Sequence, residues 1–260
     1  MRVLITGASS GIGREFAIRF ARKNYDLILT ARREDLLKQL KEELVSEYPI
    51  DCAYFAADLS KDPKAVYDWC KENGYEISVL VNNAGFGDYG TFIDSDIDKA
   101  MEMIDLNDKA LVRLTYYFLQ DMKEKRQGHI INTGSVASFI PGPYMAVYYA
   151  TKSFVMSFSM ALREELRKDN IQVSVLCPAP TKSDFWKRAN GETTAVYDNV
   201  FARTPAQAAA AGMKMYEENR PYAVDGLTYK LLIGVARHLP IELCARAVGF
   251  IQSKTKQKKN

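Results

Sequence analysis

The sequence predicts a doubly wound α/β fold, in which a single parallel β-sheet of about seven strands carries helices on both faces. One observation is that short apolar runs of strand length alternate along the chain with longer segments of helical period. A second is that these runs are continuously apolar, as is typical of parallel strands buried on both sides. The connections between the strands are therefore expected to be right-handed helical crossovers.

Six of the expected strands are clear apolar runs, and a short seventh is expected at residues 222–224. The six runs are residues 2–6, 27–31, 52–56, 78–81, 129–132 and 173–177. Between them, amphipathic segments predict helices. In the first segment Ile12, Phe16 and Phe20 recur at spacings of four, which places them on one helical face. Further helices are expected at residues 36–44, 100–124 and 149–168, and from Pro205 onward.

Composition favours one globular domain. The 260 residues are 47% hydrophobic and 26% charged, and the chain shows no internal repeat or low-complexity linker. We expect a catalytic domain at residues 1–226, with a substrate lid at about 182–204. Residues 227–260 are expected to be a helical extension of the same domain with a basic tail.

Several classes of protein are disfavoured. A net charge of +3 without a basic stripe argues against nucleic-acid binding. The four scattered cysteines and two histidines indicate buried thiols and no metal site. The chain begins directly with a strand-like run, which leaves no room for a secretory signal, and it has no apolar stretch long enough to span a bilayer. We therefore expect a cytoplasmic protein.

A glycine-rich turn directly follows the first strand. Gly7, Gly11 and Gly13 let the backbone approach a pyrophosphate, and the following helix offers unpaired N–H groups. Ser9 and Ser10 add hydroxyl donors. Glycines alone also fit an ordinary turn, but this placement between a strand and an amphipathic helix favours a dinucleotide.

The second strand ends in Thr30-Ala31-Arg32-Arg33 rather than in an acidic residue. A carboxylate there would accept hydrogen bonds from the adenosine ribose and repel a 2′-phosphate. Two guanidinium groups instead suit a phosphate. The alternative is that both arginines merely begin a solvated helix. We favour NADP(H) over NAD(H) on this charge argument.

Tyr148 and Lys152 lie four residues apart, on one face of a predicted helix. A tyrosine of ordinary pKa, near ~10, is a poor base at neutral pH. A lysine ammonium one turn away, together with the positive charge of oxidised nicotinamide, is expected to lower that pKa, so that the phenol exchanges a proton with a carbonyl or alcohol oxygen. Ser135 follows the fifth strand, where its hydroxyl would stabilise charge on the substrate oxygen. Each residue alone also fits an ordinary surface or loop position.

Together these motifs resemble the short-chain dehydrogenase/reductase family. Thr6-Gly7-Ala8-Ser9-Ser10-Gly11-Ile12-Gly13 is similar to its glycine motif, and Asn107, Ser135, Tyr148 and Lys152 match its catalytic residues in order and spacing. The resemblance runs from about residue 2 to residue 226. It implies a Rossmann-like fold and an NADP-preferring oxidoreductase.

The resemblance also assigns individual residues. Asp58 matches the family's adenine-contacting residue, and Asn107 would hold a water that links Lys152 to solvent. The implied cofactor-binding residues are Gly7, Ser9, Ser10, Gly11, Ile12, Gly13, Arg32, Arg33, Asp58, Leu59, Asn83, Ala84, Gly85, Tyr148, Lys152, Pro178, Ala179, Thr181 and Ser183.

One position departs from the family. After the sixth strand the family usually has Pro-Gly, whereas this chain has Pro178-Ala179. The methyl group of Ala179 is expected to crowd or shift the nicotinamide ring. Either Thr181 or Ser183 would supply the hydroxyl expected near the carboxamide.

Aromatic and aliphatic residues dominate the segments expected around the substrate. The candidates for the substrate pocket are Phe86, Ser135, Phe139, Tyr144, Phe185 and Trp186. They favour a bulky apolar ketone or secondary alcohol, such as a steroid-like or acyl-chain substrate. The alternative is that about half of these aromatic residues only pack the lid onto the body.

Three functions remain open. The favoured one is a carbonyl reductase or alcohol dehydrogenase. A second is reduction of 3-oxoacyl groups on an acidic carrier protein, with Lys182, Lys187 and Arg188 as a basic patch. A third is a non-catalytic NADP(H) sensor, which the intact set of catalytic residues disfavours.

Besides a small-molecule substrate, the sequence suggests two kinds of partner for the protein surface: further copies of the same chain, or a membrane. The resemblance implies a homodimer or homotetramer that pairs through the two long helices at 100–124 and 149–168. The extension after Gly226 is expected to pack on the domain or on a partner subunit. The alternative is peripheral contact with an acidic membrane, through apolar residues of the extension and the lysines of its tail. These residues are Leu231, Leu232, Ile233, Val248, Phe250, Ile251, Lys254, Lys256, Lys258 and Lys259.

Overall fold

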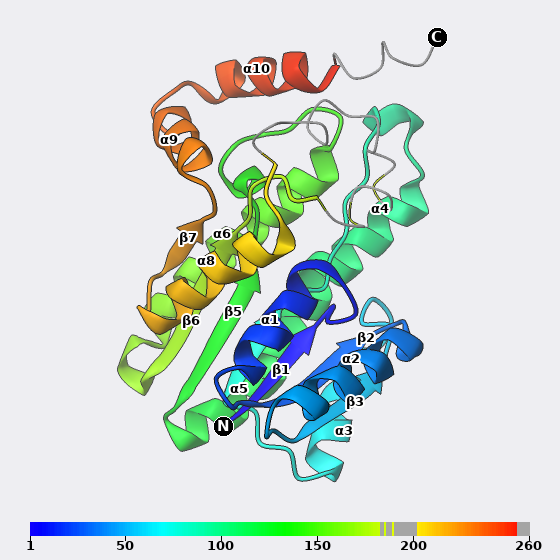
Figure 1. The fold of residues 1–260 in the computed structure, drawn as a ribbon. Helices are drawn as coiled ribbons and strands as arrows, with labels where there is room; N and C mark the ends of the chain where they lie inside the picture. Colours follow the sequence, from blue (N-terminus) through cyan, green and yellow to red (C-terminus); the bar gives the residue numbers. More distant parts are fainter. Residues whose placement is uncertain (183–184, 186–188, 190–201, 254–260) are drawn as a thin grey trace.

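A computed structural model describes residues 1–182, 185, 189 and 202–253 of the chain. The described residues form a seven-stranded sheet of order β3-β2-β1-β4-β5-β6-β7, in which every neighbouring pair is parallel (Figure 1). The predicted parallel sheet is confirmed. The strands are β1 (Arg2–Thr6), β2 (Asp26–Ala31), β3 (Cys52–Ala56), β4 (Val79–Asn82), β5 (Gly128–Thr133), β6 (Ile171–Cys177) and β7 (Tyr222–Val224).

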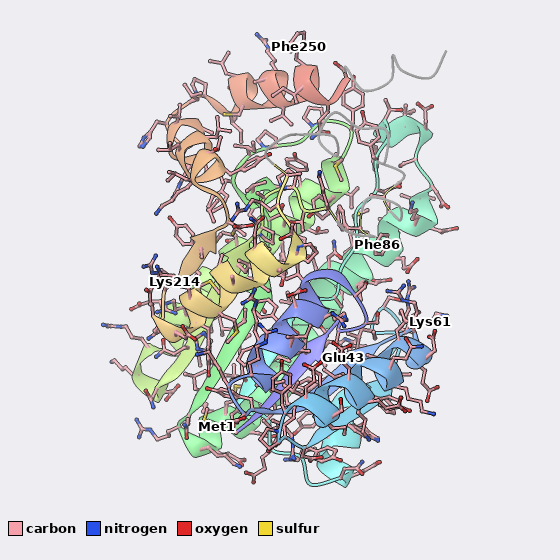
Figure 2. The ribbon with its side chains drawn as sticks, in the orientation of Figure 1. Met1, Glu43, Lys61, Phe86, Lys214 and Phe250 are labelled. Carbon is pink, nitrogen blue, oxygen red and sulfur yellow. The ribbon has the colours of Figure 1, made fainter. Side chains whose placement is uncertain are left out.

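Helices cover both faces of the sheet. Successive residues of β1 point to opposite sides, so Val3 and Ile5 belong to one apolar core and Leu4 to the other. The first core is covered by α1 (Gly11–Ala21), α2 (Glu34–Glu47) and α8 (Pro205–Glu217). The second is covered by α3 (Lys64–Glu72), α5 (Leu111–Lys125) and α6 (Ala146–Glu165). Lys214 on α8 points to solvent, whereas Phe86 lies inside the body (Figure 2).

The helix expected at residues 100–124 is present and unbroken, but it is not α-helical throughout. It consists of α4 (Ile97–Ile104), a π-helical turn at Asp105–Ala110 and α5. Asp96 caps the start of α4 by accepting hydrogen bonds from the next backbone N–H groups. The π-helical turn matters for the site because it contains Asn107.

The order of the strands creates a crevice. The chain leaves β1 toward β2 on one side, whereas β4 continues toward β5 on the other side. The connections after β1 and β4 therefore diverge at the carboxyl edge, which is where open α/β sheets bind ligands.

The C-terminal part of the described chain consists of two helices beyond β7, α9 (Leu227–Ala236) and α10 (Ile241–Ser253). α10 lies across one end of the molecule, beyond the carboxyl ends of the central strands (Figure 1). The lysine-rich segment at 254–260 lies outside the described residues. No helix of the described part is long and apolar enough to cross a membrane.

Candidate active site

A cavity of about 660 Å³ opens at the crevice between the ends of β1 and β4. It extends from Arg32 and Arg33 at one end to Tyr148 and Phe185 at the other. The predicted residues that line it are Gly7, Ser9, Ser10, Gly11, Ile12, Arg32, Arg33, Asp58, Leu59, Asn83, Ala84, Gly85, Phe86, Ser135, Tyr148, Lys152, Pro178, Ala179, Thr181 and Phe185. Among the described residues, no cluster of His, Cys, Asp or Glu side chains could hold a metal ion.

Four other predicted residues lie outside this lining. Gly13 and Asn107 lie just behind it and support it. Phe139 faces away: its ring lies 5.9 Å from that of Tyr222 and under the guanidinium of Arg237. Tyr144 stacks on Tyr89, with ring centroids 6.2 Å apart. Ser183 and Trp186 lie outside the described residues, as does most of the expected lid at 182–204.

The phosphate turn is built from strained backbone that glycine tolerates. Gly7 and Gly11 have φ of 65° and 56°, in the left-handed region that a side chain disfavours. A Cβ on Gly13 would lie 2.3 Å from the Gly7 carbonyl oxygen, so this position requires glycine for close packing.

The same turn gathers groups that bind anions. Helix α1 begins here with no acidic residue in its first turn, and the Ser10 side chain does not cap it. Arg33 donates hydrogen bonds to the hydroxyls of Ser9 and Ser10, at 3.2 and 2.8 Å. Because backbone N–H groups and hydroxyls converge at the start of α1, these residues fit the pyrophosphate of a dinucleotide.

Thr6 locks the ends of β1 and β4 together beneath the turn. Its hydroxyl accepts hydrogen bonds from the backbone N–H groups of Asn83 and Ala84, both at 2.9 Å, and donates to the carbonyl of Val81. The side-chain amide of Asn83 donates to the Thr6 carbonyl at 3.0 Å. The floor of the crevice is therefore fixed by hydrogen bonds within the chain itself.

The charged groups at the adenosine end fit a ribose phosphate. Arg32 lies 3.4 Å from Glu102 of α4, and both side chains are partly exposed. Burial alone would raise the pKa of Asp58. Hydrogen bonds from the Ser60 hydroxyl and backbone, with nearby Arg32, outweigh burial and lower that pKa. Asp58 is therefore an ionised acceptor beside a cluster of cations.

The chemical end of the cavity centres on Tyr148. The Ser135 side chain lies close enough to lower the pKa of the Tyr148 hydroxyl, and it accepts a hydrogen bond from the backbone N–H of Ala137 at 3.1 Å. Tyr148 lies on α6, and Ser135 caps the short 3-10 helix at Val136–Phe139 that follows β5. A substrate oxygen beside these two hydroxyls would contact both of them.

Lys152 lies one turn further along α6 and is almost fully buried. Its ammonium donates to the carbonyl of Thr133 at 2.9 Å and lies 5.8 Å from the centre of the Tyr148 ring. Burial lowers the pKa of Lys152 to about 8. Burial also raises the pKa of Tyr148 to about 12, an effect larger than the lowering by the nearby Ser135 side chain. The groups of the chain alone therefore do not lower the pKa of Tyr148.

Asn107 supports the site from behind. Its side-chain amide donates to the Phe86 carbonyl at 2.9 Å and to the Thr151 hydroxyl at 3.1 Å, and its oxygen accepts from the Phe86 N–H. A Cβ on Gly85 would lie 2.9 Å from that oxygen. Asn107 thus joins the segment after β4 to α6, and the π-helical turn places it there.

Comparison with known proteins decides the family. The family model described as short chain dehydrogenase matches residues 1–194. The chain belongs to the short-chain dehydrogenase family. Relatives that the chain resembles are named as reductases and dehydrogenases.

The names of individual relatives indicate different substrates. The chain is 36% identical over 177 residues to a very-long-chain 3-oxoacyl-CoA reductase of Laccaria bicolor, covering 66% of this chain and 52% of that protein. It is 38% identical over 210 residues to sulfoacetaldehyde reductase 2 of Chromohalobacter salexigens, covering 79% and 83%. Thus the chain spans about half the length of the first of these relatives.

A solved structure with the same fold contains a cofactor. It is a short-chain dehydrogenase from Sphingobium yanoikuyae in complex with NADPH, which is 32% identical to this chain. The TM-score is 0.82, and the match covers 91% of this chain and 93% of that chain.

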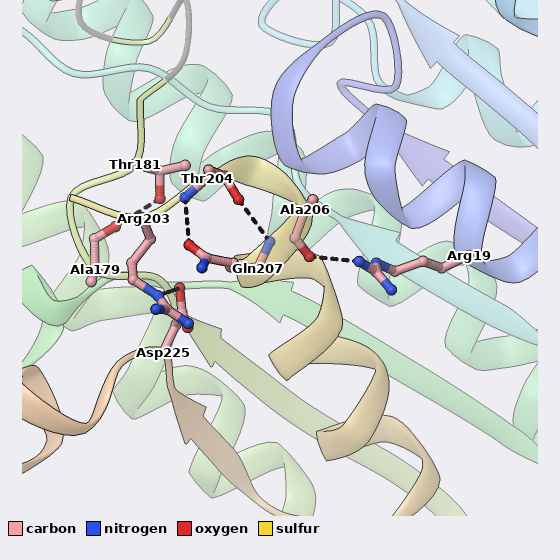
Figure 3. Close-up of polar contacts among 8 residues, drawn as sticks. All are labelled: Arg19, Ala179, Thr181, Arg203, Thr204, Ala206, Gln207 and Asp225. Atoms are coloured by element: carbon pink, nitrogen blue, oxygen red, sulfur yellow. Dashed lines mark hydrogen bonds and ion pairs between the residues drawn. The ribbon is translucent and has the colours of Figure 1, made fainter. Parts of the chain in front are cut away.

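In the segment after β6 this chain has Pro178-Ala179 in place of Pro-Gly, and Figure 3 shows polar contacts in and beside this segment. Thr181 donates to the Ala179 carbonyl at 2.8 Å, and Arg203 forms an ion pair with the buried Asp225 at 3.0 Å. The backbone of Arg203 bonds to Pro180 and Lys182. Ala179 is not among the described residues with positive φ, so its methyl group adds no backbone strain. Of the two hydroxyls considered for the carboxamide, Thr181 lines the cavity.

Several lining residues were not predicted from the sequence. They are Ala31, Ala57, Leu106, Thr133, Gly134, Val136, Ala137, Met145, Tyr149, Pro180 and Gln252. Most are sequence neighbours of predicted residues at the ends of strands. They could therefore have been predicted from their position at the carboxyl edge of the sheet. Gln252 is different, because it comes from α10 and no motif points to it.

Proposed function

We propose that the protein is an NADP(H)-dependent oxidoreductase that interconverts a ketone or aldehyde with an alcohol on a bulky apolar substrate. The observation that carries the proposal is one cavity with Arg32 and Arg33 at one end and the Ser135–Tyr148 pair at the other. The two arginines would hold the 2′-phosphate that distinguishes NADPH from NADH.

Tyr148 is the proton donor in the direction of reduction. Nicotinamide supplies the hydride to the carbonyl carbon when the cofactor is bound. The Tyr148 hydroxyl gives its proton to the substrate oxygen, and the Ser135 hydroxyl stabilises charge on that oxygen. A positive charge close to the phenol favours phenolate, so Lys152, together with the positive charge of oxidised nicotinamide when the cofactor is bound, would help Tyr148 to release its proton. Lys152 in turn is held in place by the Thr133 carbonyl.

Apolar side chains around Tyr148 favour a bulky substrate. Phe86, Met145, Val136 and Phe185 line this end, and the Phe185 ring lies 5.3 Å from the Tyr148 ring. An acyl chain or a steroid-like ring system would bury this surface. The named substrates of the relatives range from very-long-chain 3-oxoacyl-CoA to sulfoacetaldehyde. Reduction of 3-oxoacyl groups on a carrier protein stays the alternative; Lys187 and Arg188 of its expected basic patch lie outside the described residues.

The cofactor proposal is tested by titrating the protein with NADPH and NADH while nicotinamide fluorescence is recorded. We expect tight NADPH binding and weak NADH binding, with Arg32→Ala/Arg33→Ala losing most of the NADPH affinity and little of the NADH affinity. Arg14→Ala/Arg22→Ala, away from the cavity lining, is the matched control. Equal affinity for both cofactors would contradict the phosphate-binding role.

The substrate proposal is tested by turnover with NADPH on bulky ketones, 3-oxoacyl-CoA esters and carrier-bound 3-oxoacyl groups. We expect the free ketones to react and Tyr148→Phe to remove activity. Tyr116→Phe changes an exposed tyrosine of α5 and is the matched control. Turnover of the carrier-bound substrate alone would support the alternative, and no turnover of any carbonyl would overturn the proposal.

The oligomeric state belongs to the same proposal. Tyr116 on α5 and Phe154 on α6 are 61% and 42% exposed, and Phe154 stacks on Phe158. We propose a homodimer through these two helices, which light scattering of wild type and Phe154→Glu would test. The apolar residues exposed on α9 and α10, such as Leu231 and Phe250, would cover a second contact. Sedimentation with anionic vesicles would instead support the membrane alternative.

We also propose a cytoplasmic location, which fits the four buried free cysteines.

A further inference from the structure

Gln252 is a buried polar residue in the wall of the substrate end of the cavity. It lies near the end of α10, well beyond the residues 1–194 that the family model matches, and is 3% exposed. It lines the same cavity as Tyr148 and Tyr149. The C-terminal extension therefore contributes a polar group to an otherwise largely apolar part of the site.

Two hydrogen bonds fix the position of Gln252. Its side-chain nitrogen donates to the Tyr149 hydroxyl at 2.9 Å, and its backbone carbonyl accepts from the Tyr89 hydroxyl at 2.7 Å. Its side-chain oxygen is buried and has no hydrogen-bond partner among the described residues. A buried acceptor without a partner is unfavourable, so this oxygen is suited to a donor that arrives with a ligand.

Tyr149 completes the arrangement. Its oxygen accepts from Gln252, and its own proton has no acceptor among the described residues. Burial raises the pKa of Tyr149 well above its ordinary value, so the hydroxyl keeps that proton. The pair thus presents one donor and one acceptor. The rings of Tyr149 and Tyr148 have centroids 6.1 Å apart, which places the pair beside the proposed proton donor.

We propose that Gln252 and Tyr149 form a second polar subsite that binds a neutral hydroxyl group of the substrate, a few bonds from the carbonyl that is reduced. The proposal rests on the carbonyl reductase function above and makes it more specific. A hydroxyl both donates and accepts, which matches the two groups. A carboxylate does not match, because it cannot donate to the Gln252 oxygen. Among the described residues, the cations that line the cavity are Arg32, Arg33 and Lys152, at the phosphate turn and behind Tyr148.

The test compares ketones that differ only by a hydroxyl in place of a methyl group. The probes are 3-hydroxypropiophenone against butyrophenone, and 4-hydroxybutyrophenone against valerophenone. Each is titrated by calorimetry into the protein saturated with NADP⁺, because an oxidised cofactor and a ketone cannot react. We expect at least one hydroxyketone to bind about 10-fold more tightly than its methyl counterpart. The methyl counterpart cannot donate a hydrogen bond, so it leaves the buried side-chain oxygen of Gln252 unpaired.

Gln252→Met keeps the length of the side chain and removes its hydrogen bonds. In this variant we expect the hydroxyketone to lose its advantage while the methyl ketone binds as before, and Tyr149→Phe to reduce the same preference. Unchanged NADPH affinity and melting temperature would show that the variants are folded. Equal weakening of both ketones would instead mean that Gln252 only fastens α10 to α6, and no preference in the wild type would also overturn the proposal.

Turnover separates this proposal from the proposed function. Butyrophenone is assayed with NADPH and wild-type protein, and reduction supports the carbonyl reductase function whichever ketone binds better. A hydroxyl preference that Gln252→Met removes, together with no turnover of any ketone, would overturn the function and retain the subsite. The reverse result would retain the function and overturn the subsite.

Discussion

Asp108 is the residue whose surroundings most clearly couple the site to pH. It follows Asn107 in the π-helical turn, and one of its carboxylate oxygens is buried without a hydrogen-bond partner among the described residues. Burial raises the pKa of Asp108 to about 7, although nearby Lys152 acts in the opposite direction. The folded protein therefore favours the protonated carboxyl.

This shift predicts how Asp108→Asn changes stability. A raised folded pKa stabilises the protein below the unfolded pKa of about 3.9, and that stability is lost as pH rises toward 7. The amide keeps a neutral side chain at every pH. We therefore expect Asp108→Asn to melt at a higher temperature than wild type at pH 8, with a gain that shrinks toward pH 4.5. Thermal unfolding across this range measures it, and a gain that does not vary with pH would refute the ionisation argument.

Glu102 affects the other end of the cavity at the same scale. Its carboxylate lies 3.4 Å from Arg32 and competes with any phosphate for that guanidinium. We expect Glu102→Gln to raise NADPH affinity a few-fold at low salt, to have less effect at high salt, and to leave NADH affinity unchanged. Fluorescence titration measures all three. Glu76→Gln also removes one negative charge, from an exposed pair with Lys125. A similar gain there would mean that net charge alone is responsible.

The turn between β1 and α1, with the first turn of α1, is the element at which we expect small changes to affect cofactor binding. A Cβ at Gly13 would lie 2.3 Å from a backbone oxygen that cannot move without shifting the whole turn. We expect Gly13→Ala to reduce NADPH affinity at least about 10-fold, because the N–H groups of the turn lose their alignment. Gly234→Ala in α9 is the control, since nothing lies within 4 Å of its added Cβ. It is expected to leave NADPH affinity unchanged and to stabilise α9 by up to about 1 kcal/mol. Equal NADPH affinity in both variants would contradict the packing argument.

Helices, strands and turns whose conformation depends on residues close together in the sequence could be predicted from the sequence. The parallel strands follow from continuous apolar runs, and the glycine turn follows from three residues beside one strand. The π-helical turn was not predictable, because residues 100–124 read as one helix. Its position depends on the Asn107 side chain bonding to Phe86 and Thr151, which come from other segments.

Phe139 shows the same limit within the candidate pocket. It follows Ser135 closely in sequence, so a place beside the substrate was a reasonable interpretation. The 3-10 helix at Val136–Phe139 turns its ring toward Tyr222 and Arg237, which lie more than 80 residues away along the chain. Gln252 is the converse case, since a residue from the far C-terminus completes the cavity wall. Contacts between segments far apart in the sequence determine the positions of both Phe139 and Gln252. No local sequence pattern indicates these contacts.

The ion pair of Arg203 with Asp225 acts at the scale of the whole molecule, because it ties the segments after β6 and β7 to the residues that precede α8. Asp225 is 2% exposed and depends on the Arg203 guanidinium, which bonds to both of its carboxylate oxygens (Figure 3). Removing the cation leaves a buried carboxylate without its partner. We expect Arg203→Met to lower the free energy of unfolding by about 3 kcal/mol and to weaken NADPH binding, because Ala179 and Thr181 lose their support.

Three variants distinguish this buried pair from an ordinary surface contact. Arg14→Met removes the cation of a more exposed pair with Glu43 and is expected to cost no more than about 1 kcal/mol. Arg203→Met/Asp225→Asn should be more stable than Arg203→Met alone, since no buried charge is left unpaired. Chemical denaturation of each variant, with NADPH titration alongside, measures both effects. A double variant no more stable than Arg203→Met would show that lost packing of the arginine, and not the unpaired carboxylate, sets the stability of this end of the site.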